Sequence, residues 1–295
     1  MIVAKWIDNI PPDQPILIAG PTASGKSALA MYIAETAGGI IINADSVQVF
    51  SNWRVLSARP SVTEERRATH VLYGHVDGET NYSVGHWLRD IAPYLVRQER
   101  PIIVGGTGLY FSALTEGLVD IPTIPQDILN ISERRWKTEG LQALVCELDD
   151  ETRDRIDIQN PMRVMRAWQV ARYTGKSIIA WHKETLPPLL DQQNCTTIVF
   201  SSSAEWLNKQ IAKRFEKMIA LGALEEAREN LHLSSLNAPS MKAIGAGELM
   251  AYIRGELSLA AASDKAKTAT RQYAKRQRTW FRSKMKDWHS YRPNI

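Results

Sequence analysis

The sequence predicts an α/β protein in which helices cover both faces of a parallel β-sheet. Two observations carry this prediction. Short apolar runs alternate with helix-like runs in the N-terminal part of the chain, and this alternation is typical of parallel sheets with buried strands. In addition, a phosphate-loop motif stands between the first apolar run and the helix-like run after it, which is the setting in which such a motif binds anions.

The expected strands and helices follow one another in a simple order. Strands are expected at 14–20, 39–45, 101–108 and 195–203, and helices at 24–38, 81–100 and 109–117. Parallel sheets bind their ligands at the carboxyl ends of the strands. Because Gly20, Asp45 and Thr107 lie at or just past such ends, we expect the fold to bring them together.

A helical segment interrupts this pattern in the middle of the chain. Its clearest helix is expected to begin after Asn160, a good N-cap residue followed by proline, and to end at Gly175. We therefore expect a helical insertion domain at 120–190, inside an α/β core made of 1–119 and 191–295.

Two further helices are expected to close the chain. One runs through 205–222, where apolar residues repeat at helical spacing from Leu207 to Met218. In the other, every charged residue from 265 to 286 is basic. Such a block indicates a polyanionic partner, most often a nucleic acid, although a solvated helix face is the alternative interpretation.

Composition excludes several classes of protein. The chain has 295 residues, of which 44% are hydrophobic and 23% charged, and its net charge is +4, as in an ordinary globular protein. It shows neither a signal-peptide pattern nor an apolar run near the roughly 18 residues that a membrane span needs. Cys146 and Cys195 lie far apart without metal-like spacing. We interpret them as reduced thiols of a cytoplasmic protein with no membrane partner.

The phosphate-loop motif is complete. Its residues are Gly20, Pro21, Thr22, Ala23, Ser24, Gly25, Lys26 and Ser27. In such loops the backbone amides and the start of the next helix bind phosphate oxygens, the lysine adds a positive charge, and the last hydroxyl is placed to coordinate Mg²⁺. The motif predicts a P-loop NTPase-like fold that binds a nucleotide such as ATP or another diphosphate ester, and it does not distinguish between them.

Asp45 stands at the end of the second apolar strand. A carboxylate in this position can hold Mg²⁺ through water, as in ATPases, or act as a general base beside the phosphates. A structural N-cap for the next segment is a third interpretation. Ser46 and Gln48 add polar groups that could bond to a base edge or a hydroxyl. The residues alone leave these roles open.

Six segments carry a resemblance to a known family. In order along the chain they are GPTASGKSALA, INADSVQVF, IIVGGTGLYFSALTEGL, MRVMRAWQVARYTGKS, KRFEKMIALGALEEA and ATRQYAKRQRTWFR. On these segments the chain resembles the tRNA dimethylallyltransferases from about residue 15 to 288. The phosphate loop alone is generic, whereas its combination with the aspartate-serine-x-glutamine, Gly-Gly-Thr-Gly-Leu-Tyr and basic C-terminal segments is distinctive.

The resemblance implies a reaction and the residues that perform it. A dimethylallyl group would pass from dimethylallyl diphosphate to the exocyclic amine of adenosine 37, in the anticodon loop of tRNA, with release of pyrophosphate. The loop from Gly20 to Ser27 would hold the diphosphate together with Arg214, and Mg²⁺ would bind near Ser27. Asp45 would be the general base, and Thr107 would lie beside the amine.

The resemblance also implies a set of residues that contact tRNA. They are Asp45, Ser46, Val47, Gln48, Thr107, Arg163, Arg166, Lys242, Lys275, Arg276, Gln277, Arg278 and Arg282. The positions that depart from the family pattern are Phe50, Arg59, Thr69, Leu129 and Met162. These departures bear on individual tRNA contacts and on the preferred tRNA, but they remove none of the groups that the chemistry needs.

Three other functions are compatible with parts of the sequence. A P-loop kinase for a small metabolite would use the same loop and consume ATP, but it does not explain the basic C-terminal helix. An adenylate isopentenyltransferase would need neither a long basic face nor the insertion. An RNA-binding module with a vestigial nucleotide site is disfavoured by the intact loop together with Asp45 and Thr107. We expect a monomer without an obligate protein partner.

Overall fold

The chain folds into two compact units. The computed structural model describes residues 10–234 and 238–293. One unit contains the described residues up to Thr115 and those from Leu189 onward, and the other runs from Glu116 to Pro188. Among the described residues, no helix is both long and apolar enough to cross a membrane.

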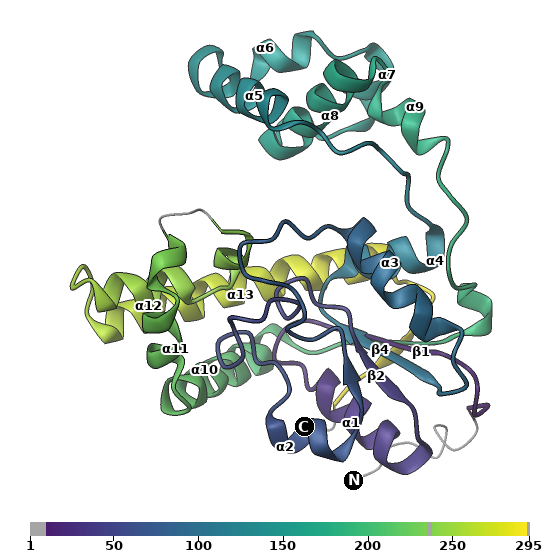
Figure 1. The fold of residues 1–295 in the computed structure, drawn as a ribbon, viewed down its shortest axis with the longest axis vertical. Helices are drawn as coiled ribbons and strands as arrows, with labels where there is room; N and C mark the ends of the chain where they lie inside the picture. Colours follow the sequence, from purple (N-terminus) through teal and green to yellow (C-terminus); the bar gives the residue numbers. More distant parts are fainter. Residues whose placement is uncertain (1–9, 235–237, 294–295) are drawn as a thin grey trace. The chain divides into compact units, whose positions relative to one another are not determined.

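The first unit is built on a parallel β-sheet (Figure 1). Within the described residues its strands are β1 (Ile16–Ala19), β2 (Ile40–Asn43), β3 (His70–Val71), β4 (Pro101–Gly105), β5 (Thr196–Phe200) and β6 (His289–Tyr291). They lie side by side in the order β3-β2-β4-β1-β5-β6, and every pair is parallel. The predicted α/β fold class is confirmed, as are the four strands expected from the apolar runs.

Helices surround this sheet. The longer ones are α1 (Lys26–Ala37), α3 (Val84–Leu95), α4 (Gly108–Glu116), α10 (Ala204–Ala220), α12 (Ala246–Ile253) and α13 (Leu259–Lys284). The shorter ones are α2 (Val62–Arg67), η2 (Gln192–Asn194), α11 (Ala223–Glu229), η3 (Leu231–Ser234) and η4 (Pro239–Lys242). The helices expected in this part of the chain, including the basic C-terminal one, are confirmed.

Different helices cover the two faces of the sheet, because neighbouring residues of a strand point to opposite faces. Leu17 and Ala19 of β1 pack in a cluster with side chains of α3 and α4. Ile16 and Ile18 pack in a second cluster with side chains of α1. Figure 1 shows α3 and α4 on one side of the central strands and α1 on the other. All four β1 side chains are fully buried, so the core holds this strand on both faces of the sheet.

The sequence does not predict β3 and β6. β3 has only two residues, and β6 has three, of which His289 and Ser290 are exposed. These strands form the two edges of the sheet. An edge strand is bonded on one side only and does not have to be an apolar run. Their positions depend on pairing with β2 and β5, which local sequence does not record.

The segment 46–61, which follows β2, is fixed on a cluster of helices formed by α10, α11, α12 and α13. Trp53 is fully buried in this cluster. The Glu226 carboxylate on α11 accepts hydrogen bonds from the backbone amides of residues 54–56 at 2.5 to 2.9 Å. A charged acceptor that binds three amides holds the backbone of this segment firmly.

The second unit is helical. Its helices are α5 (Gln126–Glu139), α6 (Leu141–Cys146), α7 (Asp150–Arg155), α8 (Pro161–Thr174) and α9 (Ile178–His182). Its core includes Leu144 and Trp168. α8 has the ends that the sequence predicts: the Asn160 side chain accepts a hydrogen bond from the Met162 amide at 3.1 Å, and Gly175 ends the helix with a φ of 69°. The role of this unit in contacting tRNA stays a prediction.

Replacing Glu226 with Gln is expected to lower the free energy of unfolding by about 1–3 kcal/mol. The amide has a single acceptor oxygen and leaves at least one backbone amide of 54–56 without its partner. Urea unfolding of the variant and the wild type measures the change. Glu229→Gln, at an exposed position of the same helix, is the control and is expected to change stability by less than about 0.5 kcal/mol. Equal effects of the two substitutions would contradict the holding role of Glu226.

Candidate active site

The phosphate loop connects β1 to α1 where the strand ends. Gly25, directly before α1, has a φ of 92°, a left-handed conformation that favours glycine. No side chain caps the start of this 12-residue helix, so its first backbone amides are available to an anion. The Ser24 side chain is fully buried, and its hydroxyl has no hydrogen-bond partner among the described residues. These features fit a loop that binds phosphate groups.

Two cationic side chains lie close to the loop. Lys26 on α1 and Arg214 on α10 line one pocket together with Asp45. Burial lowers the pKa of Lys26 to about 8, the charge of Asp45 opposes this shift, and the charge of Arg214 adds to it. Burial also lowers the pKa of Arg214, again against the effect of Asp45. Two cations thus face one carboxylate, and an anion in the pocket would balance their charge.

Asp45 is held by the turn that follows β2. The buried Asn43 side chain accepts a hydrogen bond from the Asp45 amide at 2.9 Å and donates one to the Asp45 carbonyl at 3.0 Å. Trp87 in turn donates to the Asn43 carbonyl at 2.8 Å. Asp45 Oδ1 accepts a hydrogen bond from the Val47 amide at 3.0 Å. Its Oδ2 has no hydrogen-bond partner among the described residues, so this oxygen is left for a ligand in the pocket.

Thr107, just past β4, is bonded to the same turn. Its amide donates to the Ala44 carbonyl at 3.1 Å. Its hydroxyl accepts from the Ser46 amide at 2.9 Å and donates to the Ser46 hydroxyl at 3.2 Å. Gly20 donates to the carbonyl at the end of β4 at 3.3 Å. The structure therefore brings Gly20, Asp45 and Thr107 together, as the argument from strand ends predicts.

One pocket of the first unit contains Lys26, Asp45 and Arg214, whereas Gly20, Ser27 and Thr107 lie outside its lining. Its polar lining consists of Thr22, Lys26, Asp45, Gln48, Ser57, Arg214, Thr270 and Tyr273. Its apolar lining consists of Val47, Leu56, Ile211, Phe215, Met218, Ala243 and Ile244. A small molecule with a charged group and a short apolar group matches this division.

Sequence reasoning missed the apolar wall and Tyr273. Phe215 belongs to the helical repeat that predicts burial of one face of α10, and that repeat does not tell a core position from a pocket wall. Tyr273 stands within the basic segment of α13. Burial and the charge of Asp45 raise the pKa of Tyr273, and the charge of Arg276 and the nearby polar side chains of Thr107 and Gln277 oppose the shift. Tyr273 therefore lies close enough to Asp45 to feel its charge.

Gln277, one of the residues predicted to contact tRNA, lies on the buried face of α13. It lies in the basic segment, but its side chain is only 6% exposed. Its Oε1 accepts a hydrogen bond from the Thr22 amide, and its Nε2 donates one to the Gly106 carbonyl, both at 2.8 Å. Both polar ends of the side chain therefore have partners inside the protein. The contact with tRNA stays a prediction, and the burial of Gln277 shows that α13 has a buried face that the charge pattern does not mark.

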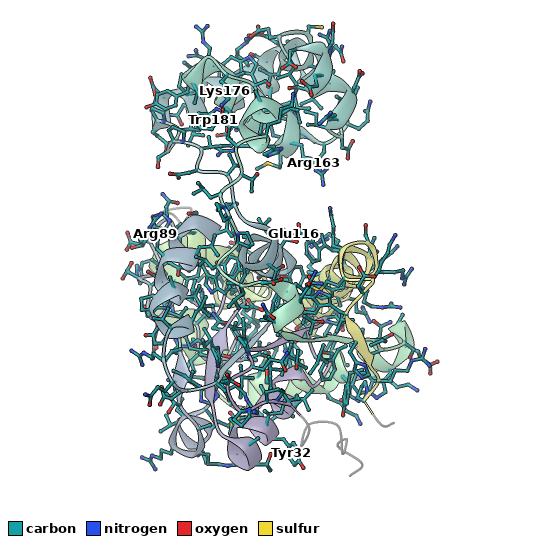
Figure 2. The ribbon with its side chains drawn as sticks, turned by 90° about the vertical axis from the view of Figure 1, so that its right-hand side faces the viewer. Tyr32, Arg89, Glu116, Arg163, Lys176 and Trp181 are labelled. Atoms are coloured by element: carbon teal, nitrogen blue, oxygen red, sulfur yellow. The ribbon has the colours of Figure 1, made fainter. Side chains whose placement is uncertain are left out.

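The other residues predicted to contact tRNA lie mostly at the surface. Gln48 lines the pocket, and its Nε2 donates to the carbonyls of Ser57 and Ala58 at 2.9 and 3.0 Å, which leaves only its Oε1 for a ligand. Figure 2 shows Arg163 at the surface of the helical unit. The exposed members of the set are Arg163 and Arg166 on α8, Lys242 in η4, and Lys275, Arg276 and Arg282 on α13, where Arg278 is half-buried.

Two of the departures from the family pattern lie inside the first unit. Phe50 is 4% exposed and packs against Val76. Arg59 donates to the carbonyls of Phe50 and Ser51 at 3.2 and 3.1 Å. These two side chains therefore act on the packing of the segment 46–61. Met162, on α8, is instead 70% exposed.

The protein groups that could hold Mg²⁺ are few. Ser27 is exposed in the first turn of α1, and Asp45 lines the pocket. The described residues contain no group of three or more His, Cys, Asp or Glu side chains that could hold a metal ion. Mg²⁺ is commonly bound by one or two protein oxygens together with substrate phosphates and water. The Ser27 hydroxyl and the Asp45 carboxylate offer oxygen ligands of the kind that such an ion takes.

Comparisons with known proteins agree over nearly the whole chain. A family model described as IPP transferase matches residues 48–284, and one described as isopentenyl transferase matches residues 14–75. A tRNA dimethylallyltransferase of Ruegeria sp. (strain TM1040) is 54% identical, with 97% of this chain and 98% of that protein covered. A tRNA dimethylallyltransferase of Roseobacter denitrificans (strain ATCC 33942 / OCh 114) is 55% identical, with 96% and 100% covered.

Solved structures give the same result. The full-length tRNA isopentenylpyrophosphate transferase of Bacillus halodurans superposes with a TM-score of 0.66 at 28% identity, and 95% of this chain and 90% of that chain are covered. A eukaryotic dimethylallyltransferase, described as acting on tRNA, gives a TM-score of 0.79 at 25% identity, with 94% and 73% covered. Because sequence and fold agree over nearly its whole length, the chain belongs to the IPP transferase family.

Proposed function

We propose that this protein transfers the dimethylallyl group of dimethylallyl diphosphate to the exocyclic amine of adenosine 37, in the anticodon loop of tRNA, and releases pyrophosphate. One observation carries the proposal: a single pocket combines the cations Lys26 and Arg214, the carboxylate of Asp45 and an apolar wall. Membership of the IPP transferase family supports the same reaction, since relatives that share more than half of its residues are named tRNA dimethylallyltransferases.

The first chemical task is the departure of pyrophosphate. The bond between the allylic carbon and the diphosphate oxygen breaks, and the carbon bonds to the amine nitrogen. The amides of the loop 20–27, with Lys26 and Arg214, would bind the oxygens that gain negative charge. Donors that are already in place stabilise such a leaving group without reorganisation. Mg²⁺, when bound with Ser27, supplies further positive charge to the diphosphate.

The second task is removal of the amine proton. Asp45 Oδ1 is held by the Val47 amide at 3.0 Å, and the free Oδ2 would accept the proton as the nitrogen bonds to carbon. The nitrogen becomes strongly acidic at that stage, so an ordinary carboxylate is a sufficient base. Thr107, which is bonded to Ser46, would orient the amine. A positioned general base typically contributes about 10²–10⁴ in rate.

We propose α13 and the helical unit as the surfaces that bind tRNA. The exposed basic side chains of α13 form no ion pair with an acid among the described residues, and the half-buried Lys267 pairs with Glu216. They would bind phosphates irrespective of base sequence. The reacting adenine has to leave the stack, and an unpaired loop base is the least costly to extrude. On the helical unit, Arg163 and Arg166 would contact tRNA.

We also propose where and in which form the protein acts. Cys146 and Cys195 are both free thiols, which fits a reducing compartment such as the cytoplasm. We propose that it acts as a monomer.

An adenylate isopentenyltransferase is the second candidate. The isopentenyl transferase model matches residues 14–75, a stretch that includes the generic phosphate loop. One experiment separates the candidates: the protein is incubated with dimethylallyl diphosphate, Mg²⁺ and either undermodified tRNA, AMP or ATP, and prenylated adenosine is measured by mass spectrometry. Product with tRNA supports our proposal. Product with AMP alone supports the second candidate, and ATP turnover without prenylation contradicts both.

Asp45→Asn is expected to lower kcat by about 10²–10⁴-fold while tRNA still binds with its wild-type Kd. The asparagine oxygen can still accept the hydrogen bond from the Val47 amide, so the turn is kept and only the base is lost. Single-turnover prenylation and filter binding measure the two quantities. Asp77→Asn is a matched control, because Asp77 is exposed and accepts a hydrogen bond from the Glu79 amide at 2.9 Å in a similar turn. Near-normal turnover of Asp45→Asn would show that Asp45 is not the general base.

Dimethylallyl diphosphate is expected to bind more weakly as the pH rises above about 8. The pKa of Lys26 is lowered to about 8 in the free protein, so its charge is present below this pH and is lost above it. Bound diphosphate favours the charged lysine, and the Kd is expected to rise by up to about tenfold per pH unit. Isothermal titration calorimetry without tRNA, from about pH 7 to 9.5, measures the Kd over the range in which Lys26 loses its proton. Lys26→Arg stays charged and should give a flat profile, and a flat wild-type profile would contradict the role of Lys26.

Binding of tRNA is expected to weaken steeply with salt, since phosphate contacts release counterions. Arg282→Ala is expected to lower the slope of log K against log salt by about 1, whatever the tRNA sequence. Fluorescence anisotropy at several salt concentrations measures the slopes. The control is Lys209→Ala on α10, where the lysine pairs with Glu205 at 2.8 Å. If both variants kept the wild-type slope, α13 would not be the phosphate-binding surface.

A further inference from the structure

Gln277 joins two loops of the candidate active site to α13. Its Oε1 accepts a hydrogen bond from the Thr22 amide, and its Nε2 donates one to the Gly106 carbonyl, both at 2.8 Å. A backbone amide can only donate and a carbonyl can only accept, so these partners fix which way the side-chain amide faces. The contact with Gly106 is close: a Cβ at that position would lie 2.4 Å from the Gln277 nitrogen. A side chain at this position would have to displace the Gln277 amide.

The two loops that Gln277 joins carry different parts of the proposed reaction. Thr22 belongs to the phosphate loop and lines the pocket. Gly106 directly precedes Thr107, whose hydroxyl is bonded to Ser46 in the Asp45 turn. One loop would hold the diphosphate, and the other is bonded to the turn of the proposed base. A single side chain thus bridges the leaving-group side and the proton-accepting side of the pocket, in addition to the backbone bond between Gly20 and Gly105.

α13 presents one face to the protein interior and the opposite face to the solvent. Gln277 lies on its buried face together with Ala274 and Phe281, which are each 3% exposed. The neighbouring Lys275 and Arg276 are exposed. The same helix thus supplies basic groups at the surface and, through Gln277, a direct bond to the phosphate loop.

We propose that Gln277 is a positioning residue that holds the phosphate loop and the Gly106–Thr107 turn in the mutual arrangement that prenyl transfer requires. This inference rests on the proposed function and deepens it. Gln277 acts through the backbone of Thr22 and Gly106 and touches neither substrate. Displacing a reacting group by about 1 Å can lower the rate about 10²-fold, so the loss of these two bonds is expected to act mainly on kcat.

The test compares variants of the full-length protein. Gln277→Met keeps the length of the side chain and removes both hydrogen bonds. Gln277→Asn keeps the amide but is one methylene shorter, so it can reach at most one of the two partners. Gln272→Met makes the same change at an exposed position of the same helix and is the matched control. Each variant is measured for kcat, for the Kd of inorganic pyrophosphate with Mg²⁺, for the Kd of tRNA and for the melting temperature.

The positioning role predicts a selective pattern. For Gln277→Met, kcat is expected to fall about 10²-fold and pyrophosphate to bind about tenfold more weakly, as when a supporting contact of a binding site is lost. The Kd of tRNA is expected to stay within about twofold, since the exposed face of α13 is unchanged. Gln277→Asn should show a smaller loss of kcat, and Gln272→Met should match the wild type.

Other patterns overturn the inference. If Gln277→Met keeps wild-type kcat and pyrophosphate binding, or lowers only the melting temperature, its hydrogen bonds do not position the loops. A loss of tRNA affinity equal to the loss of pyrophosphate affinity also overturns it, because both sites are then disturbed together. If Gln277→Met does not fold, Gln277→Asn decides by the same criteria.

Failure of the proposed function gives a different result from failure of this inference. If the wild-type protein prenylates none of the acceptors, the proposed function fails for wild type and variants alike. Pyrophosphate binding still tests the positioning of the phosphate loop in that case. If the wild type prenylates tRNA and Gln277→Met does so equally well, only the positioning role of Gln277 is overturned.

Discussion

The parallel pairing of β2, β4 and β1 is the constraint on which the candidate site depends. Ile102 of β4 pairs with Ile41 on one side and with Ile16 on the other, so the three strands run in register and end at one edge. The phosphate loop, the Asp45 turn and the Thr107 turn each follow one of these strands. A register shift of one residue would turn the buried side chains to the wrong face. The apolar core therefore also fixes the positions of the groups that the proposed chemistry needs.

The charge in the pocket explains why the site needs an anion. Lys26 and Arg214 are partly withdrawn from water beside a single carboxylate, Asp45. Buried charge is unfavourable unless it is paired. In the proposed reaction the diphosphate would balance the charge of these two cations. The apolar wall beside it, with Phe215 and Met218, would favour a substrate whose other end is a short hydrocarbon over a nucleoside.

α13 shows which features of a helix its charge pattern predicts and which it does not. The charge pattern identifies a basic helix, and Lys275, Arg276 and Arg282 are exposed as that pattern suggests. The family resemblance predicts a tRNA contact for Gln277, and the structure shows that its side chain is buried and bonded to Thr22. A polar residue in a charged segment carries no local sign of burial, because the apolar neighbours that bury it come from distant parts of the chain. The acceptor role of Glu226 for residues 54–56 is hidden in the same way.

The sequence by itself determined the strands with apolar runs, the longer helices, the phosphate loop and the meeting of Gly20, Asp45 and Thr107. These features follow from local patterns and from one rule about parallel strand ends, so they need no knowledge of distant contacts. Only the tertiary structure decided which side chains of α10 and α13 line the pocket, which edge strands complete the sheet, and that Gln277 faces the phosphate loop. Each of these depends on packing between segments far apart in the chain, and the physical reason is that burial and hydrogen-bond partners are properties of the folded arrangement.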